Sequence, residues 1–259
     1  MKIILIGILF ISILLLVGCD AIVQDNEGIV LESFSIYENN LNIENPSTFL
    51  MFITDIRKEA TYTIKSRIFE QNNIRITFPE VEIDSDEMQT KINSLIWEDV
   101  QILINWLPDD WDYDIALDVD YRIALSTDRM LSIVYTGLYF AQGTPGPSSI
   151  FFTTNVNILT GERVVLNSVI CIDESFITLL KSDNANFLIP EQRDFVISQF
   201  ISNDKFQNRL QSADNKEISE IFSYFTHDSL GISIGGIGRG GGSHAEIEIS
   251  YEVLLYRKY

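Results

Sequence analysis

The sequence has few of the residues from which metal and redox sites are usually built. Its 259 residues include only two cysteines and two histidines. Two cysteines cannot supply a disulfide framework. The histidines, His227 and His244, could ligate zinc only with help from nearby acids, and their spacing fits neither a helix nor a short metal-binding loop. We therefore predict no metal site and no cofactor.

Arrangements that activate a nucleophile are also missing. The sequence has no Gly-x-Ser-x-Gly motif and no cysteine beside a histidine, which are usual signs of nucleophilic catalysis. The glycine-rich run from Ile234 to Ser243 lacks the Lys-Ser/Thr ending of a phosphate-binding loop, and a strand-like run follows it where a dinucleotide site needs a helix. We interpret this run as a hairpin connection, and we do not expect the chain to be an enzyme.

Basic residues are scarce, with 18 Lys and Arg against 37 Asp and Glu, and the formal net charge is −19. Such a charge repels nucleic acid, so nucleic acid is not expected as a partner. It would attract a cation or a basic protein, although solubility alone is a sufficient reason for it.

One long hydrophobic run, Ile3 to Leu16, follows Met1-Lys2 at the N-terminus. The run is shorter than the about 20 apolar residues of a transmembrane helix, and a positive charge followed by a hydrophobic stretch is typical of a secretory signal. The residues that end it, Leu16-Val17-Gly18-Cys19, resemble the lipobox of bacterial lipoproteins.

The lipobox resemblance implies cleavage before Cys19 and diacylglycerol on its sulfur, with two acyl chains holding the protein at the lipid bilayer. Residues 1–18 would be a signal peptide, and residues 19–57 a lipidated N-terminus and tether. The protein would then lie on the extracytoplasmic face of the cell membrane; the alternative is an uncleaved N-terminal anchor. With lipid on Cys19, we expect Cys171 to pack as a small buried thiol, with no intrachain disulfide.

Hydrophobic periodicity predicts a single α+β domain over residues 58–259, with a central antiparallel sheet and helices packed on one face. Helices are expected at three places, of which the clearest is capped by Asp84: 84–107, 173–181 and 190–201. Strands are expected at 60–69, 74–78 (ending at Pro79), 117–125, 130–140, 151–157, 162–166, 221–225, 230–234 and 246–256.

Alternating acids and aromatics follow the first of these helices, and they are the candidate binding residues: Asp109, Asp110, Trp111, Asp112, Tyr113 and Asp114. Their spacing is similar to the start of an EF-hand loop, but Ile115 stands where glycine is needed and Tyr121 where the bidentate glutamate is needed. We interpret them as a candidate contact for a protein partner or a sugar. The alternative is a solvated acidic loop whose aromatics pack onto the domain.

A run from Asn155 to Leu166 resembles the Asn-x-Asp/Asn-x-x-Thr-Gly hairpin of the extracellular domain shared by the anti-sigma factor RsiV and the peptidoglycan deacetylase PdaC. Two flanking runs, Phe225–Ile232 and Glu246–Leu254, resemble that family's last strands, and the likeness extends over about residues 58–257. Two runs depart from the pattern: Asn167-Ser168-Val169-Ile170 replaces an acid and an aromatic, and Gly143-Thr144-Pro145 replaces a Gly-Ala-His loop.

The family resemblance implies a binding or sensing module at the cell surface. Lysozyme is the ligand associated with the anti-sigma member, so the expected partner is a cationic protein such as lysozyme or a cell-wall component. A cell-wall glycan hydrolase that uses paired carboxylates such as Asp110, Asp112 and Asp114 is the rival hypothesis, and a structural lipoprotein is a third.

Overall fold

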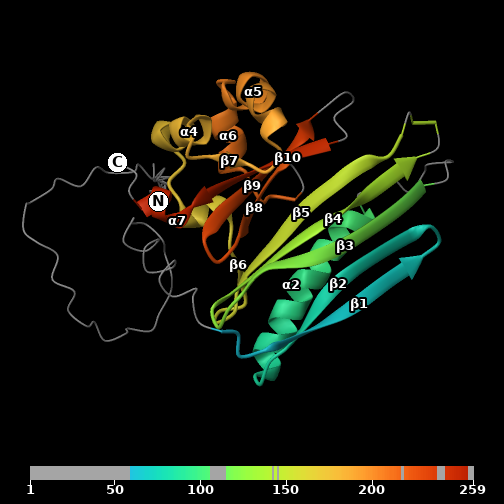
Figure 1. Cartoon of the computed structure of the whole chain (residues 1–259). Coiled ribbons are helices and arrows are strands. Elements are labelled where there is room, and N and C mark those ends of the chain that lie inside the picture. The colour runs from blue at the N-terminus through green and yellow to red at the C-terminus, as the bar shows by residue number, and fades with distance from the viewer. Residues whose placement is uncertain are drawn as a thin grey trace, which may run out of the picture. The chain divides into compact units, whose positions relative to one another are not determined.

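The structure, a computed structural model, describes residues 59–105, 115–141, 143–144, 146–216, 219–237 and 243–255. All of them lie in one compact unit, Asn39–Lys258. The α+β prediction is confirmed, because two mainly antiparallel sheets are combined with helices (Figure 1). Among the described residues, no helix is both long enough and apolar enough to cross a membrane.

The larger sheet has six strands in the order β1-β2-β3-β4-β5-β6. Their bounds are β1 Thr63–Gln71, β2 Ile74–Glu82, β3 Ile115–Ser126, β4 Met130–Ala141, β5 Ser148–Asn157 and β6 Glu162–Arg163. All neighbours pair antiparallel except β2 and β3, which pair parallel over three residues. The predicted hairpin of the first two strands is confirmed, and Asn72 turns it with a positive φ of 52°.

Helix α2, Asp86–Asn105, packs on one face of this sheet (Figure 1). The apolar stripe predicted for residues 84–107 faces the core, with Ile92, Ile96 and Val100 buried. The cap is one residue later than predicted, because the Ser85 Oγ, and not Asp84, accepts a hydrogen bond from the Met88 N–H at 3.3 Å.

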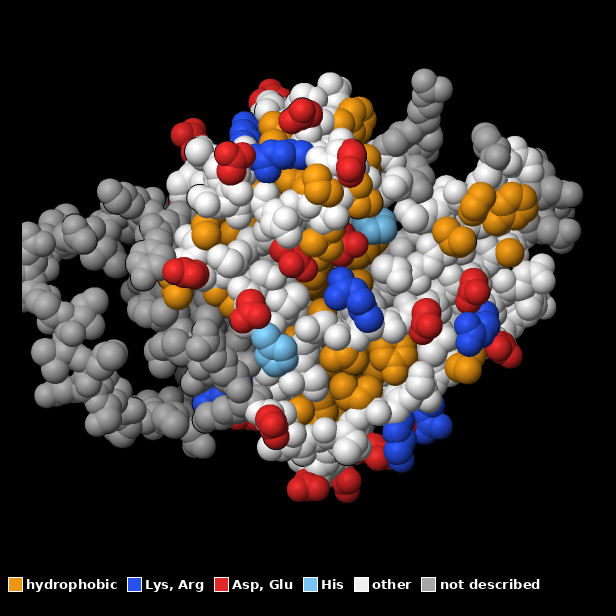
Figure 2. Space-filling view, viewed as in Figure 1, with side chains coloured by type: hydrophobic (Ala, Val, Ile, Leu, Met, Phe, Trp, Pro, Cys, Tyr) orange, Lys and Arg blue, Asp and Glu red, His pale blue; other side chains and the backbone are white. Residues whose placement is uncertain are grey.

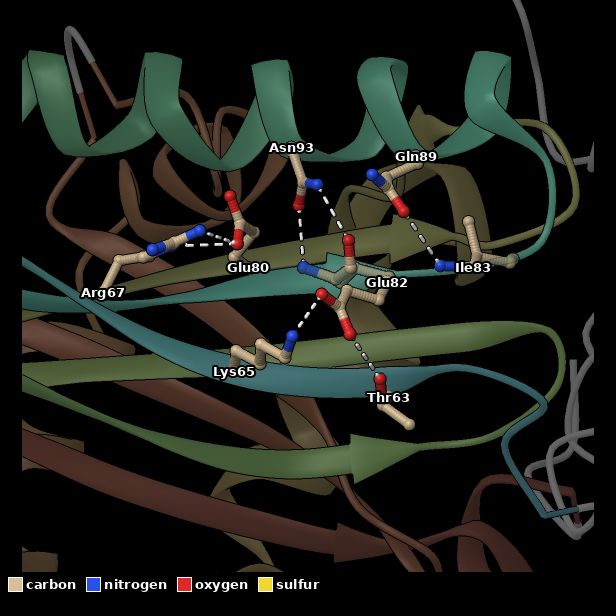
Figure 3. Close-up of polar contacts among 9 residues, drawn as sticks. Thr63, Lys65, Arg67, Glu80, Glu82, Ile83, Gln89 and Asn93 are labelled. Atoms are coloured by element: carbon tan, nitrogen blue, oxygen red, sulfur yellow. Dashed lines mark hydrogen bonds and ion pairs between the residues drawn. The ribbon is translucent and has the colours of Figure 1, made fainter.

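Strand β2 continues to Glu82 although the sequence predicted an end at Pro79. The proline is tolerated because β3 pairs only with Ile74–Ile76, so one edge of β2 has no partner strand beyond that point. Two side chains of α2 form hydrogen bonds with the backbone along that edge instead (Figure 3). The Asn93 side-chain amide accepts from the Val81 N–H and donates to the Val81 C=O, each at 2.8 Å, and the Gln89 side chain accepts from the Ile83 N–H.

The smaller sheet has four antiparallel strands in the order β7-β10-β9-β8. Their bounds are β7 Asn186–Phe187, β8 Ile221–Phe225, β9 Ser229–Ile237 and β10 Ser243–Ser250. The glycine-rich run thus joins a hairpin, as predicted. The predicted last strand is too long, because the chain turns into helix α7, Tyr251–Leu255, where the Ser250 Oγ accepts from the Val253 N–H.

Short helices cover one face of the smaller sheet and share a core with its isoleucines. They are α3 Leu166–Val169, α4 Glu174–Lys181, a 3₁₀ turn Pro190–Gln192, α5 Arg193–Val196, a π-helical turn Ile197–Ile201 and α6 Phe206–Gln211. The helix predicted over residues 173–181 begins one residue later, at Glu174, with Asp173 as its cap, accepting from the Phe176 N–H. The Pro190–Ile201 helix forms as three successive helical turns.

The polar residues of the Asn155–Leu166 hairpin have structural roles where the two sheets meet. The Asn155 side chain accepts from the Ser132 Oγ on β4 at 2.7 Å and donates to the Ser223 carbonyl on β8 at 2.8 Å. The Asn157 side chain accepts from two turn N–H groups, and Gly161 adopts a φ of 65°. The motif therefore joins two sheets where one central sheet was predicted.

Candidate ligand-binding pocket

The binding and lipidation residues predicted from the sequence, Asp109–Asp114 and Cys19, lie outside the described residues. The structure does show Cys171, and it corrects the expectation of a buried thiol with no disulfide. Cys171 is half-buried and disulfide-bonded, although its neighbours Ile170 and Ile172 are buried as the apolar context predicts.

A surface pocket of about 420 Å³ opens where α2 approaches the first hairpin. It is lined by residues of β1, β2 and α2: Arg67, Ile68, Phe78, Pro79, Glu80, Asn93 and Trp97. Its volume is within the range of about 300–1,000 Å³ that is usual for small-molecule sites. The pocket lies beside the open edge of β2, because Pro79 on that strand and Asn93, which bonds Val81 at the same edge, both line it.

Aromatic rings form one wall of the pocket. The half-buried Trp97 ring lies with its centroid 5.5 Å from that of Phe78 and 6.1 Å from that of Phe69, both in tilted arrangements. Tilted pairs at these distances are favourable because the positive ring edge approaches the negative face. The Trp97 ring is therefore held in place by β1 and β2 while part of its surface faces solvent.

The polar wall is an ion pair across the hairpin (Figure 3). The Arg67 Nε and Nη2 both donate to Glu80 Oε2, at 2.9 and 2.6 Å. The hydrogen bonds and the ion pair from Arg67 all go to Glu80 Oε2, which leaves Oε1 as the oxygen that could accept from a ligand. The Arg67 side chain is 57% exposed and that of Glu80 32%, so the pair is accessible.

A buried charge network fixes α2 behind the pocket. Asp99, two residues after Trp97 and therefore on another side of the helix, is fully buried and receives hydrogen bonds from both Nη atoms of Arg163 at 2.7 Å. Thr154 donates to the same carboxylate, and Lys216 forms an ion pair with it.

The charges in this network shift each other's ionisation. Burial alone would raise the pKa of the Asp99 carboxyl, but Lys216 and Arg163 outweigh burial and hold the pKa below its usual value. Burial lowers the pKa of Lys216 to about 8, even though Asp99 opposes that change. The network is thus a structural clamp between α2, β6 and the segment before β8.

The lining of the pocket has the chemistry that suits a small molecule with both an apolar face and hydroxyl groups. Aromatic rings accept the C–H face of such a ligand, while the Arg67–Glu80 pair offers donors and an acceptor at its rim. In the described ranges, no group of three or more His, Cys, Asp and Glu side chains is placed to hold a metal ion.

Sequence reasoning did not find these pocket residues. The alternating pattern predicted the two strands and the helix, but the open edge of β2 depends on where β3 stops pairing, which is a property of the fold. The one available signal was Trp97, an aromatic residue within the predicted helix that is not part of its apolar stripe.

Comparison with known proteins gives a likeness in structure only. No family model matches the sequence, and no curated protein sequence matches it. The structure is similar to the crystal structure of a DUF3298 family member from Bacteroides fragilis, with TM-score 0.48 and 9% identity, over 78% of this chain and 95% of that chain.

A second similar structure is a DUF3298 family protein from Pseudomonas aeruginosa, with TM-score 0.43 and 8% identity, over 79% of this chain and 99% of that chain. DUF3298 is a family of domains of unknown function. Neither likeness assigns a ligand or an activity.

Proposed function

We propose that this protein is a lipid-anchored, extracytoplasmic binding module whose pocket between α2 and the first hairpin takes a saccharide of the cell wall. The observation that carries the proposal is the Trp97–Phe78 aromatic wall beside the accessible Arg67–Glu80 pair. Sugar rings present C–H faces that stack on aromatic rings, and their hydroxyls both donate to carboxylates and accept from guanidinium.

The lipobox resemblance and the RsiV/PdaC-like hairpin support the location in this proposal. Cys171 is disulfide-bonded and the chain has only two cysteines, so lipid on Cys19 excludes a Cys19–Cys171 disulfide and the two states are alternatives. A module held to the membrane by lipid on Cys19 would face the cell wall directly. The hairpin resemblance supports a binding or sensing role, with the ligand taken from the same compartment.

A cationic protein such as lysozyme is a second candidate ligand, favoured by the formal net charge of −19. A basic partner would be attracted by the long-range field of the whole chain, which salt screens beyond about 10 Å at 0.1 M. Its binding should therefore weaken as salt rises, mainly through slower association. Binding of a neutral saccharide in the pocket should change little over the same range.

Isothermal titration of the full chain in detergent, with soluble cell-wall disaccharide and separately with lysozyme at two salt concentrations, tests both candidates. The saccharide is expected to bind the wild type, and Trp97→Ala should lose about tenfold or more in affinity, as buried anchor residues do. The matched control is Phe195→Ala on α5, a 47% exposed aromatic outside the pocket.

Saccharide affinity that is unchanged in Trp97→Ala would remove the pocket from the proposal. Salt-sensitive binding of lysozyme alone would favour the second candidate. The rival glycan hydrolase is tested in the same samples, because release of new reducing ends during incubation would indicate cleavage in place of binding.

A further inference from the structure

A second cluster of polar side chains lies where β10 of the smaller sheet packs beside β5 of the larger one. Alternate residues of β10 carry polar side chains on the side opposite the helix-covered core, while Ala245, Ile247 and Ile249 between them are buried in that core. In Figure 2, a histidine, acids and basic side chains meet near the middle of the face shown, next to hydrophobic side chains. The cluster shares no residue with the pocket on α2.

Three of these side chains form a chain of polar contacts. The Ser149 Oγ on β5 lies 3.3 Å from His244 Nδ1, and His244 Nε2 lies 3.5 Å from Glu246 Oε1. The histidine therefore stands between a hydroxyl and a carboxylate, one at each ring nitrogen. A hydroxyl, a base and a group that orients the base are the parts of an activated nucleophile, and in a ligand-free site their contacts are often loose.

Neighbouring groups fix the histidine and its acid. The Phe151 ring packs against the His244 ring with centroids 4.7 Å apart, which restrains the imidazole. Arg122 on β3 contacts Glu246 at 3.3 Å and stacks its guanidinium 4.9 Å above the Tyr224 ring.

The ionisation state of the Glu246 carboxyl suits a group that orients His244. Burial would raise its pKa, but His244 and Arg122 outweigh burial and lower it, so Glu246 stays ionised and can stabilise an imidazolium. The side chains of His244 and Glu246 are each about one-fifth exposed, at 21% and 19%, so both are partly open to solvent.

Two exposed apolar side chains of β4 lie on the same face of the sheet as Ser149. Leu138 on β4 is the register partner of Ser149, so the two side chains project from the same face of the sheet. Leu138 is 55% exposed, and Phe140, two residues along the same face, is 40% exposed. Exposed apolar side chains beside a hydroxyl and a base match an ester whose acyl part is hydrophobic.

We propose that Ser149, His244 and Glu246 form a hydrolytic site for esters with a small apolar acyl group. Ser149 Oγ attacks the carbonyl carbon and passes its proton to His244. The ester C–O bond breaks as His244 gives that proton to the leaving alcohol. Water then attacks the acyl-serine with His244 as base, which releases the carboxylic acid and restores the serine. Glu246 is a positioning residue that orients and stabilises the imidazole.

Serine-directed labelling of the folded full chain tests the proposal without any variant. A fluorophosphonate probe should modify Ser149, identified by mass spectrometry of the peptide that contains it, and p-nitrophenyl butyrate should be hydrolysed faster than in buffer. Absence of label on Ser149 in a chain with native circular dichroism would overturn the proposal.

Variants then separate catalysis from structure. Ser149→Ala should abolish labelling and hydrolysis, while Ser148→Ala, one residue away on the opposite face of the strand, should keep both. His244→Gln should lower hydrolysis by about 100-fold or more, the usual contribution of a general base. Glu246→Gln should lower the rate and shift the pH profile of kcat/KM; hydrolysis that survives in Ser149→Ala would refute the assignment.

Discussion

Arg163 and Asp99 form a two-point ion pair, with each guanidinium Nη 2.7 Å from a carboxylate oxygen and the Asp99 side chain fully buried. The pair joins β6 to α2, and Lys216 brings a second positive charge to the same carboxylate from the segment before β8. Three parts of the chain that are far apart in sequence are thus held to one side chain.

Asp99→Asn should destabilise the fold by about 3–5 kcal/mol, because it leaves the buried Lys216 ammonium and the partly buried Arg163 guanidinium without their shared anion. Urea unfolding followed by circular dichroism measures the change in the free energy of unfolding. Asp183→Asn is the matched control, since that side chain is fully exposed and should have little effect. A cost for Asp99→Asn below about 1 kcal/mol, typical of an exposed pair, would contradict the clamp.

The same carboxyl predicts a dependence of stability on pH. The pKa of Asp99 is lower in the folded chain than in the unfolded chain, so its contribution is complete above the unfolded value of about 3.9. That contribution is lost as pH falls through the lower folded value. Thermal unfolding from pH 6 to pH 2 should therefore show a smaller loss of Tm in Asp99→Asn than in the wild type. An equal loss of Tm with falling pH in the variant and the wild type would contradict the lowered pKa of Asp99.

Gly231 on β9 is required by the Tyr224 ring that packs across it. A Cβ added at Gly231 would lie 2.1 Å from Tyr224 Cζ, which no rearrangement short of moving the ring can relieve. Gly231→Ala should cost about 1–3 kcal/mol, as overpacking of a filled core does. Gly146→Ala is the control, because nothing lies within 4 Å of its Cβ. Equal unfolding midpoints for both variants would show that the ring moves freely.

Asn93 should stabilise the part of β2 that has no partner strand on one side. Asn93→Ala leaves the Val81 N–H and C=O without their partner, at a cost of about 1–3 kcal/mol for buried unsatisfied groups. Hydrogen exchange of the Val81 amide should quicken in this variant more than that of Ile76, which pairs with strands on both sides. Thr90→Ala, on an exposed turn of the same helix, serves as control.

The sequence predicted most elements of this fold but not how they assemble. Periodicity located α2, the first hairpin and the β3–β4 pair, because each has a pattern set by its own neighbours along the chain. It missed the continuation of β2 past Pro79 and the end of β10 at Ser250, because these depend on an unpaired edge and on a side-chain cap. Ser149 and His244 are 95 residues apart, and no local pattern brings them together.

Attachment of lipid to Cys19 is tested by the mass of the peptide that contains it. Diacylglycerol on the sulfur is expected, together with loss of residues 1–18, and Cys19→Ala should leave the membrane fraction. One sulfur cannot hold both a thioether and a disulfide. A disulfide-linked peptide that joins Cys19 to Cys171, or a variant that stays in the membrane with its full leader, would contradict lipidation.

The most direct test of saccharide binding follows the indole N–H signals of the three tryptophans, Trp97, Trp106 and Trp111. The full chain, labelled with ¹⁵N on tryptophan, is titrated with soluble cell-wall disaccharide, and the Trp97 signal is assigned with Trp97→Phe. A saturable shift of the Trp97 signal, with little change in the other two, is the result that the pocket predicts. A shift of the Trp111 signal alone would place the ligand on the run of acids and aromatics from Asp109 to Asp114, and no shift at saturating sugar would contradict saccharide binding.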